Sequence, residues 1–132
     1  MSLLLPLIQR VRALEARLDG ALDAVGLTPA RWSVLDELVR AGEPLTLTEL
    51  ASRLSCVRSN ITQLVGRLES DGLVERIHDP SDRRTARAGL TDTGMEAHAA
   101  GSDVLERLQQ EVATSLCAED RAALERVVKV LG

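Results

Sequence analysis

A turn-forming run, Asp79-Pro80-Ser81-Asp82-Arg83-Arg84, separates two short strand-like segments in a chain whose remaining pattern is helical. Asp-Pro and Ser-Asp pairs favour turns, so residues 73–78 and 85–90 are predicted to pair as a β-hairpin with this run at its tip. Adjacent arginines at such a tip are costly to bury. The run therefore restricts the chain to a small helical fold with one projecting hairpin, whose tip suits contact with an anion.

Apolar residues at intervals of three and four predict helices on both sides of this hairpin. Thr28 before Pro29, Thr46 with Glu49, and Thr91 are N-cap signals that mark where three of them begin. The predicted fold is mainly α (α+β), in one domain, with a core built almost entirely from aliphatic side chains because Trp32 is the only aromatic residue. The predicted helices cover residues 4–25, 29–40, 46–54, 57–70, 92–116 and 121–131.

The third and fourth predicted helices, joined by Ser55-Cys56-Val57, have the proportions of a helix-turn-helix. In that motif the second helix enters the major groove of DNA through its N-terminal half. Its expected inward face is apolar, and its outward face holds side chains able to bond base edges or phosphates: Arg58, Ser59, Asn60, Thr62, Gln63 and Arg67. A merely solvated helix face would more commonly carry Glu and Lys, whereas no acid occurs between residues 57 and 67.

The charge distribution also singles out this region. The chain has a formal net charge of −4, but residues 53–87 contain seven arginines and five acids, and the flanks on both sides are acidic. A local basic face attracts phosphates within a screening length of about 8–10 Å, whatever the total charge. The acidic total therefore does not exclude nucleic acid as a partner.

With the hairpin added, the chain resembles the MarR family of bacterial transcriptional regulators. The resemblance extends over nearly the whole chain and implies a winged helix-turn-helix at residues 28–94. The motifs that carry it are found, in the family's order, at residues 47–51, 59–69, 71–74, 79–84 and 90–94.

The resemblance implies a homodimer on a palindromic DNA operator, with long helices at residues 1–27 and 95–132 as the dimerisation region. An intramolecular helical bundle is the alternative for those helices. It further implies that Arg84 at the wing tip enters the minor groove, with Asp82 pairing across the turn to aim it. Arg83 is expected to contact a phosphate or to form a salt bridge at the strand edge. A simple surface Asp–Arg pair is the alternative for Asp82 and Arg84.

MarR-like proteins commonly release DNA on binding a small molecule or on oxidation of a cysteine. The resemblance therefore implies a repressor whose repression is relieved in one of these two ways. Cys56 is expected to be a buried, inert thiol in the helix-turn-helix turn. Its alternative is a redox switch, because nearby arginines and a helix N-terminus would favour the reactive thiolate. Cys117 is expected to pack, with an inter-subunit thiol left open. Trp32 is expected to anchor the winged helix to the dimerisation helices, with a place in a ligand pocket as the alternative.

Other classes of protein are not favoured. The two cysteines, His78 and His98 lack metal-site spacing, and no nucleophile–base pair is apparent, so neither a cofactor, a metal nor an enzyme is expected. No apolar run approaches a membrane span and the N-terminus lacks a basic leader region, which favours a cytoplasmic protein. A winged helix used only for protein–protein association remains the competing function.

Overall fold

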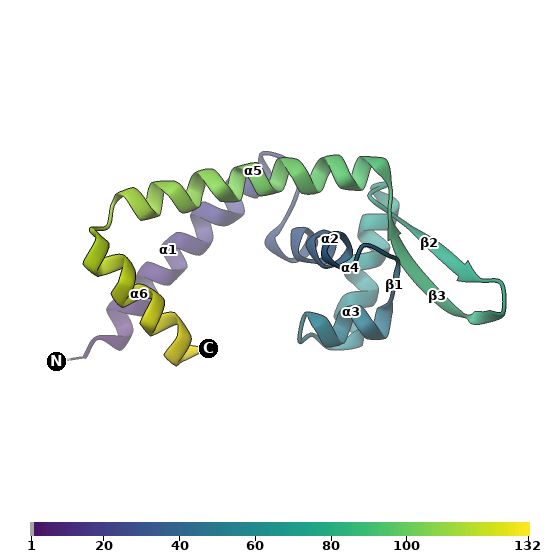
Figure 1. Cartoon of the computed structure of the whole chain (residues 1–132), viewed down its shortest axis with the longest axis horizontal. Coiled ribbons are helices and arrows are strands. Elements are labelled where there is room, and N and C mark those ends of the chain that lie inside the picture. Colours follow the sequence, from purple (N-terminus) through teal and green to yellow (C-terminus); the bar gives the residue numbers. More distant parts are fainter. Residues whose placement is uncertain (1) are drawn as a thin grey trace.

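One long helix, α5 (Asp92–Thr114), connects the two ends of the molecule (Figure 1). The computed structural model describes the backbone of residues 2–132, and their side chains apart from Asp79, Asp82, Arg83 and Arg84. The predicted mainly helical winged fold is confirmed. Five further helices complete it: α1 (Leu4–Asp23), α2 (Pro29–Ala41), α3 (Leu47–Arg53), α4 (Arg58–Ser70) and α6 (Ala118–Leu131).

Three strands form an antiparallel sheet in the order β1-β3-β2. The hairpin of β2 (Val74–Asp79) and β3 (Asp82–Leu90) is longer than predicted, and it projects from one end of the molecule (Figure 1). The short strand β1 (Leu45–Thr46) was not predicted; it pairs Leu45 with Ala88. Two residues are too few for a period-2 pattern, so β1 left no signal in the sequence.

The helix starts confirm the N-cap predictions. The hydroxyl oxygens of Thr28, Thr46 and Thr91 accept hydrogen bonds from backbone N–H groups three residues later, at 3.2, 3.1 and 3.0 Å. Each cap satisfies one of the backbone donors that a helix N-terminus leaves unpaired. The boundaries of α2, α3 and α5 are therefore determined by residues adjacent in sequence.

The hydrophobic core lies at the winged end of the molecule. Its buried apolar side chains are all aliphatic, and they come from the end of α1 and the segment after it, from α2, α3 and α4, from the sheet, and from the segment between α4 and β2. By contrast, α6 buries no residue and α1 buries only Leu22. These two helices lie at the end of the molecule opposite the hairpin, where both chain termini also lie (Figure 1). None of the helices in the described chain is both long and apolar enough to cross a membrane.

Two glycines allow α5 to approach the winged end closely. A Cβ at position 101 would overlap Cδ1 of Trp32, and one at position 94 would overlap the carbonyl oxygen of Leu73. Both contacts would be shorter than those that Cβ atoms make in real proteins. Helix α5 therefore packs against α2 and the start of the hairpin only because these positions lack side chains.

Gly101→Ala should destabilise the protein by about 1–3 kcal/mol, because overpacking forces Trp32 out of its position. A Cβ added at Gly66, in the interior of α4, would meet no neighbouring group within 4 Å. Gly66→Ala is therefore the matched control and should stabilise the protein by about 0.5–1 kcal/mol. Urea unfolding at one protein concentration measures both. Equal effects of the two substitutions would contradict the close approach.

Candidate nucleic-acid interface

Helix α4 divides into a buried face and an exposed face. Ile61, Val65 and Leu68 are fully buried, as expected for the apolar inward face, and Leu64 is half-buried against the core. The six residues predicted to read DNA all lie exposed: Arg58, Ser59, Asn60, Thr62, Gln63 and Arg67. We call this set the reading face. The structure thus brings the helical candidates together on one surface.

Ion pairs separate the arginines of this region into two groups. Arg53 lies 3.8 Å from Glu37, Arg76 2.9 Å from Glu69, and Arg87 3.5 Å from Glu49. Among the side chains that the structure describes, Arg58 and Arg67 have no acidic partner within 4 Å. In α3, α4 and the described part of the hairpin, the guanidinium groups without a carboxylate partner are thus those on the reading face, where they are able to meet phosphates or guanine edges.

The start of α4 has no side-chain cap. Its N-cap is Val57, which makes no side-chain hydrogen bond, and Ser55 adopts a positive φ of 52° instead of capping the helix. Within the helix, the hydroxyl of Thr62 donates to the carbonyl of Arg58 at 3.0 Å. Thr62 therefore has its donor engaged and retains only acceptor capacity toward a ligand.

An ion pair joins the wing, which is the β2–β3 hairpin, to helix α4. Arg76 on β2 forms an ion pair with Glu69 near the end of α4, with Nε 2.9 Å from Oε2. The hairpin register shifts between His78 and Asp79, immediately before the tip. The predicted roles of Asp82, Arg83 and Arg84 fall on side chains outside the described part of the structure, so they stay predictions.

Both cysteine predictions are wrong about burial. Cys56 is exposed, with Sγ 3.5 Å from the carbonyl oxygen of Leu54. The positive φ of Ser55 turns the chain there, and Leu54 supplies the apolar contact with the core. Cys117 is also exposed; it is the N-cap of α6, where Sγ accepts from the backbone N–H of Asp120 at 3.4 Å.

Trp32 forms the junction between α2 and α5, as predicted. Its ring stacks on His98 with centroids 5.4 Å apart, and Nε1 donates to the His98 carbonyl at 3.3 Å. His98 Nε2 in turn lies 2.9 Å from Oδ1 of Asp36. The His98–Asp36 contact was not predicted, because the two residues are 62 positions apart and share no motif. Trp32 also lines a cavity of about 1020 Å³; its alternative role, in a ligand pocket, stays a prediction.

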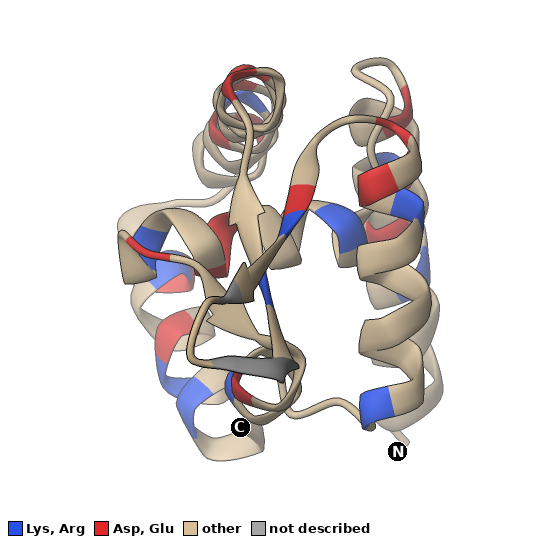
Figure 2. Ribbon diagram, turned by 90° about the vertical axis from the view of Figure 1, so that its right-hand side faces the viewer, with Lys and Arg blue, Asp and Glu red and all other residues tan. Residues whose placement is uncertain are grey.

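Charge is mixed over the molecule. Figure 2 shows basic and acidic residues side by side along the helices, in keeping with the ion pairs within and between neighbouring elements. Within the described residues no group of three or more His, Cys, Asp or Glu side chains is placed to hold a metal ion. The arrangement is that of a polar binding face beside a projecting hairpin.

Comparison with known proteins agrees with this geometry. The profile of the MarR family matches residues 25–85. A transcriptional activatory protein from Rhodopseudomonas palustris, BadR, is 38% identical over 76 residues, which are 56% of this chain and 43% of that protein. A repressor from Bacillus subtilis, MdtR, is 36% identical over 74 residues, which are 56% of this chain and 47% of that protein. The chain thus spans less than half of the length of these relatives.

The fold is also found among solved structures. A mutant of MarR from Escherichia coli, complexed with operator DNA, superposes with a TM-score of 0.79 at 27% identity, and the match covers 99% of each chain. BadR and MdtR are thus transcriptional regulators, and the MarR mutant is bound to operator DNA.

Val57→Ser should stabilise the protein by about 0.5–2 kcal/mol, because a hydroxyl at the N-cap would accept a hydrogen bond from an unpaired N–H at the start of α4. Val57 is 63% exposed, so the change removes little buried apolar surface. Thermal or urea unfolding measures the effect. Val57→Ala is the control and should give no comparable gain; a serine variant no more stable than wild type would show that the start of α4 is already satisfied.

Proposed function

We propose that this chain, whose residues 25–85 match the profile of the MarR family, is a homodimeric, sequence-specific DNA-binding transcriptional regulator that acts as a repressor in the cytoplasm. Its ligand is a palindromic operator, with one winged helix on each half-site. The relatives include both a repressor and an activatory protein. The direction of regulation, here repression, is therefore the part of the proposal that depends on which genes the operator controls.

The reading face carries the proposal. It presents two arginines without a carboxylate partner among the described side chains, together with Asn60 and Gln63, on the exposed side of α4. Arg bonds bidentately to guanine, and Asn or Gln to adenine, in the major groove. The apolar opposite side holds this helix on the core. Such a helix suits base readout better than protein–protein association, which favours apolar and aromatic contacts.

The wing extends the same surface. The Arg76–Glu69 ion pair joins β2 to the end of α4, so the hairpin and the reading face are carried as one unit. We propose that Arg84 enters the minor groove, that Asp82 orients it, and that Arg83 contacts the phosphate backbone. The three residues lie at the start of β3, and the roles proposed for them are those that the family resemblance implies.

The dimer is proposed to form through the end of the molecule farthest from the wing. Twelve of the sixteen exposed large apolar side chains that the structure describes lie in residues 3–14 and 124–131. A monomer in water rarely exposes so continuous an apolar surface. A two-fold axis through this region would bury it and would place two reading faces on one DNA duplex.

Arg84→Ala should weaken operator binding and flatten the slope of log affinity against log salt concentration by about one unit per subunit. Without this positive charge, fewer counterions leave the DNA when the protein binds. A gel-shift titration over salt concentration measures the slope. Arg107→Ala is the charge-matched control, since Arg107 lies on α5 beside α1, away from α4.

Gln63→Ala separates base readout from phosphate contact. It should leave the salt slope unchanged and relax the preference at one base pair of the site by about 1–3 kcal/mol. Binding that depends on neither salt, Arg84 nor Gln63 would exclude this DNA-binding mode and favour the protein-association alternative.

Val128→Glu on α6 should convert the protein from dimer to monomer, because it places a charge on the proposed apolar interface. Sedimentation analysis measures the mass. Met95→Glu is the matched control: Met95 is 56% exposed and Val128 60% exposed, but Met95 lies at the opposite end of α5. A wild-type protein that sediments as a monomer, or two variants that behave alike, would contradict this interface.

A further inference from the structure

Val57 lies exposed at the start of the reading helix. It is the N-cap of α4, and 63% of its surface is accessible to solvent. Most other exposed large apolar side chains belong to the proposed dimer interface at the far end of the molecule. Outside that interface, the structure describes three more, Val39, Ile77 and Met95, and each is less exposed than Val57. An apolar side chain is thus most exposed where DNA is proposed to bind.

A valine at this position does not serve the stability of α4. Its side chain cannot accept a hydrogen bond from an N–H group of the first turn, whereas Ser, Thr, Asp and Asn can. Two residues earlier, Ser55 has a φ of 52°, in the left-handed region that residues other than glycine seldom adopt. Local costs of this kind are concentrated at functional sites. Together they favour a role for Val57 in binding.

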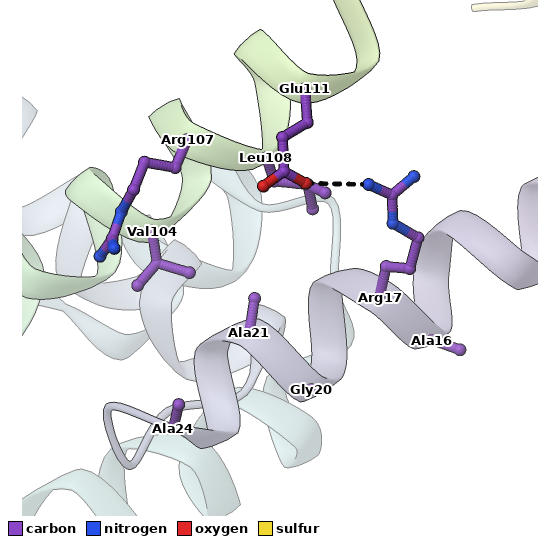
Figure 3. Close-up of a pocket in the computed structure, with 9 residues that line it drawn as sticks. All are labelled: Ala16, Arg17, Gly20, Ala21, Ala24, Val104, Arg107, Leu108 and Glu111. Atoms are coloured by element: carbon purple, nitrogen blue, oxygen red, sulfur yellow. Dashed lines mark hydrogen bonds and ion pairs between the residues drawn. The ribbon is translucent and has the colours of Figure 1, made fainter. Parts of the chain in front are cut away.

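Neighbouring cavities do not account for the exposed valine. A groove of about 570 Å³ alongside α4 is lined by residues of α2 and α4 and by Cys56. A cavity of about 450 Å³ lies at the crossing of α1 and α5, where Figure 3 shows Arg17 bonded to Glu111. Val57 lines neither of them. Its apolar surface therefore suits a macromolecule that covers the start of α4 better than a small molecule held in either cavity.

The backbone holds Val57 beside the reading face. Its carbonyl oxygen accepts hydrogen bonds from the backbone N–H groups of Asn60, at 3.1 Å, and Ile61, at 3.3 Å. The residues that follow it, Arg58, Ser59 and Asn60, are all exposed. In a helix-turn-helix, the N-terminal residues of the second helix contact the base edges. Val57 is therefore continuous with the surface proposed to read DNA and is fixed in place relative to Asn60.

We propose that Val57 contacts the 5-methyl group of a thymine in the major groove, next to the base that Asn60 reads. This specificity contact rests on the proposed function. The thymine methyl is the apolar group that base edges present in the major groove, and apolar side chains contact it. Burial of that methyl against the valine removes apolar surface from water and so favours thymine over cytosine. Since Val57 has no charge, the contact adds sequence preference without phosphate attraction.

Replacement of single thymines by uracil tests the contact, because uracil keeps the hydrogen-bonding edge of thymine and lacks only the 5-methyl group. The DNA is the site selected from random duplexes, with one thymine of a half-site replaced at a time, and gel shifts with the full chain measure affinity. Wild type should bind about fourfold more weakly when one particular thymine is replaced. That thymine should lie within about two base pairs of the position whose preference relaxes in Asn60→Ala.

Failure of the contact and failure of DNA binding give different results. If wild type binds the selected site but no uracil weakens it, or if no thymine lies near the position read by Asn60, the valine contact is overturned and DNA binding stands. If wild type binds no duplex at all, the proposed function falls together with the contact.

Two variants assign the effect to Val57. Val57→Ala and Val57→Ser both remove its methyl groups, so each should bind the thymine and uracil duplexes with equal affinity. A serine N-cap is expected to stabilise α4, so loss of discrimination in this variant cannot come from unfolding. Met95→Ala is the control and should discriminate as wild type does, because Met95 is 56% exposed but lies on α5.

The salt dependence of the same variants completes the test. Neither substitution of Val57 should change the slope of log affinity against log salt concentration, since no charge is removed. Discrimination between thymine and uracil that persists in both variants would show that uracil acts through the shape of the DNA, and would overturn the proposal. A flattened slope in both variants would also overturn it, because phosphate contacts would then have been lost.

Discussion

The packing of α2 against α5 at Trp32 is the contact on which the arrangement of the molecule depends. The absence of a side chain at Gly101 lets the indole lie against α5, where it stacks on His98 and bonds its carbonyl. Asp36 then holds His98 from the same side of α2. These contacts join the winged end to the helices that carry the exposed apolar surface. They therefore determine how two reading faces would be spaced in a dimer.

The arginines that join neighbouring elements differ from those on the reading face in their ion pairs. Arginines that connect elements are paired, as with Arg76 and Glu69, and those on the reading face have no acidic partner among the described side chains. An arginine already paired with a carboxylate gains less from a phosphate than a solvated one, because the ion pair must first be broken. The acidic composition of the whole chain therefore coexists with a surface suited to DNA.

Features determined by neighbouring residues were predictable from the sequence. The N-caps at Thr28, Thr46 and Thr91, and the two faces of α4, follow from local hydrogen bonding and helical periodicity. Features that depend on distant residues were not. The sequence has no signal for the pairing of Leu45 with Ala88 or of Asp36 with His98, and the exposure of Cys56 depends on the backbone of Ser55. The dimerisation helices and the roles at the wing tip stay predictions.

Selection of bound sequences from random duplex DNA, followed by hydroxyl-radical footprinting of the selected site, tests the central claim most directly. A homodimer with one winged helix per half-site predicts an inverted repeat whose half-sites are about 10 base pairs apart, or a multiple of that spacing, with protection over both half-sites. Failure to enrich any sequence, or enrichment of a single unrepeated site with one protected patch, would contradict the account.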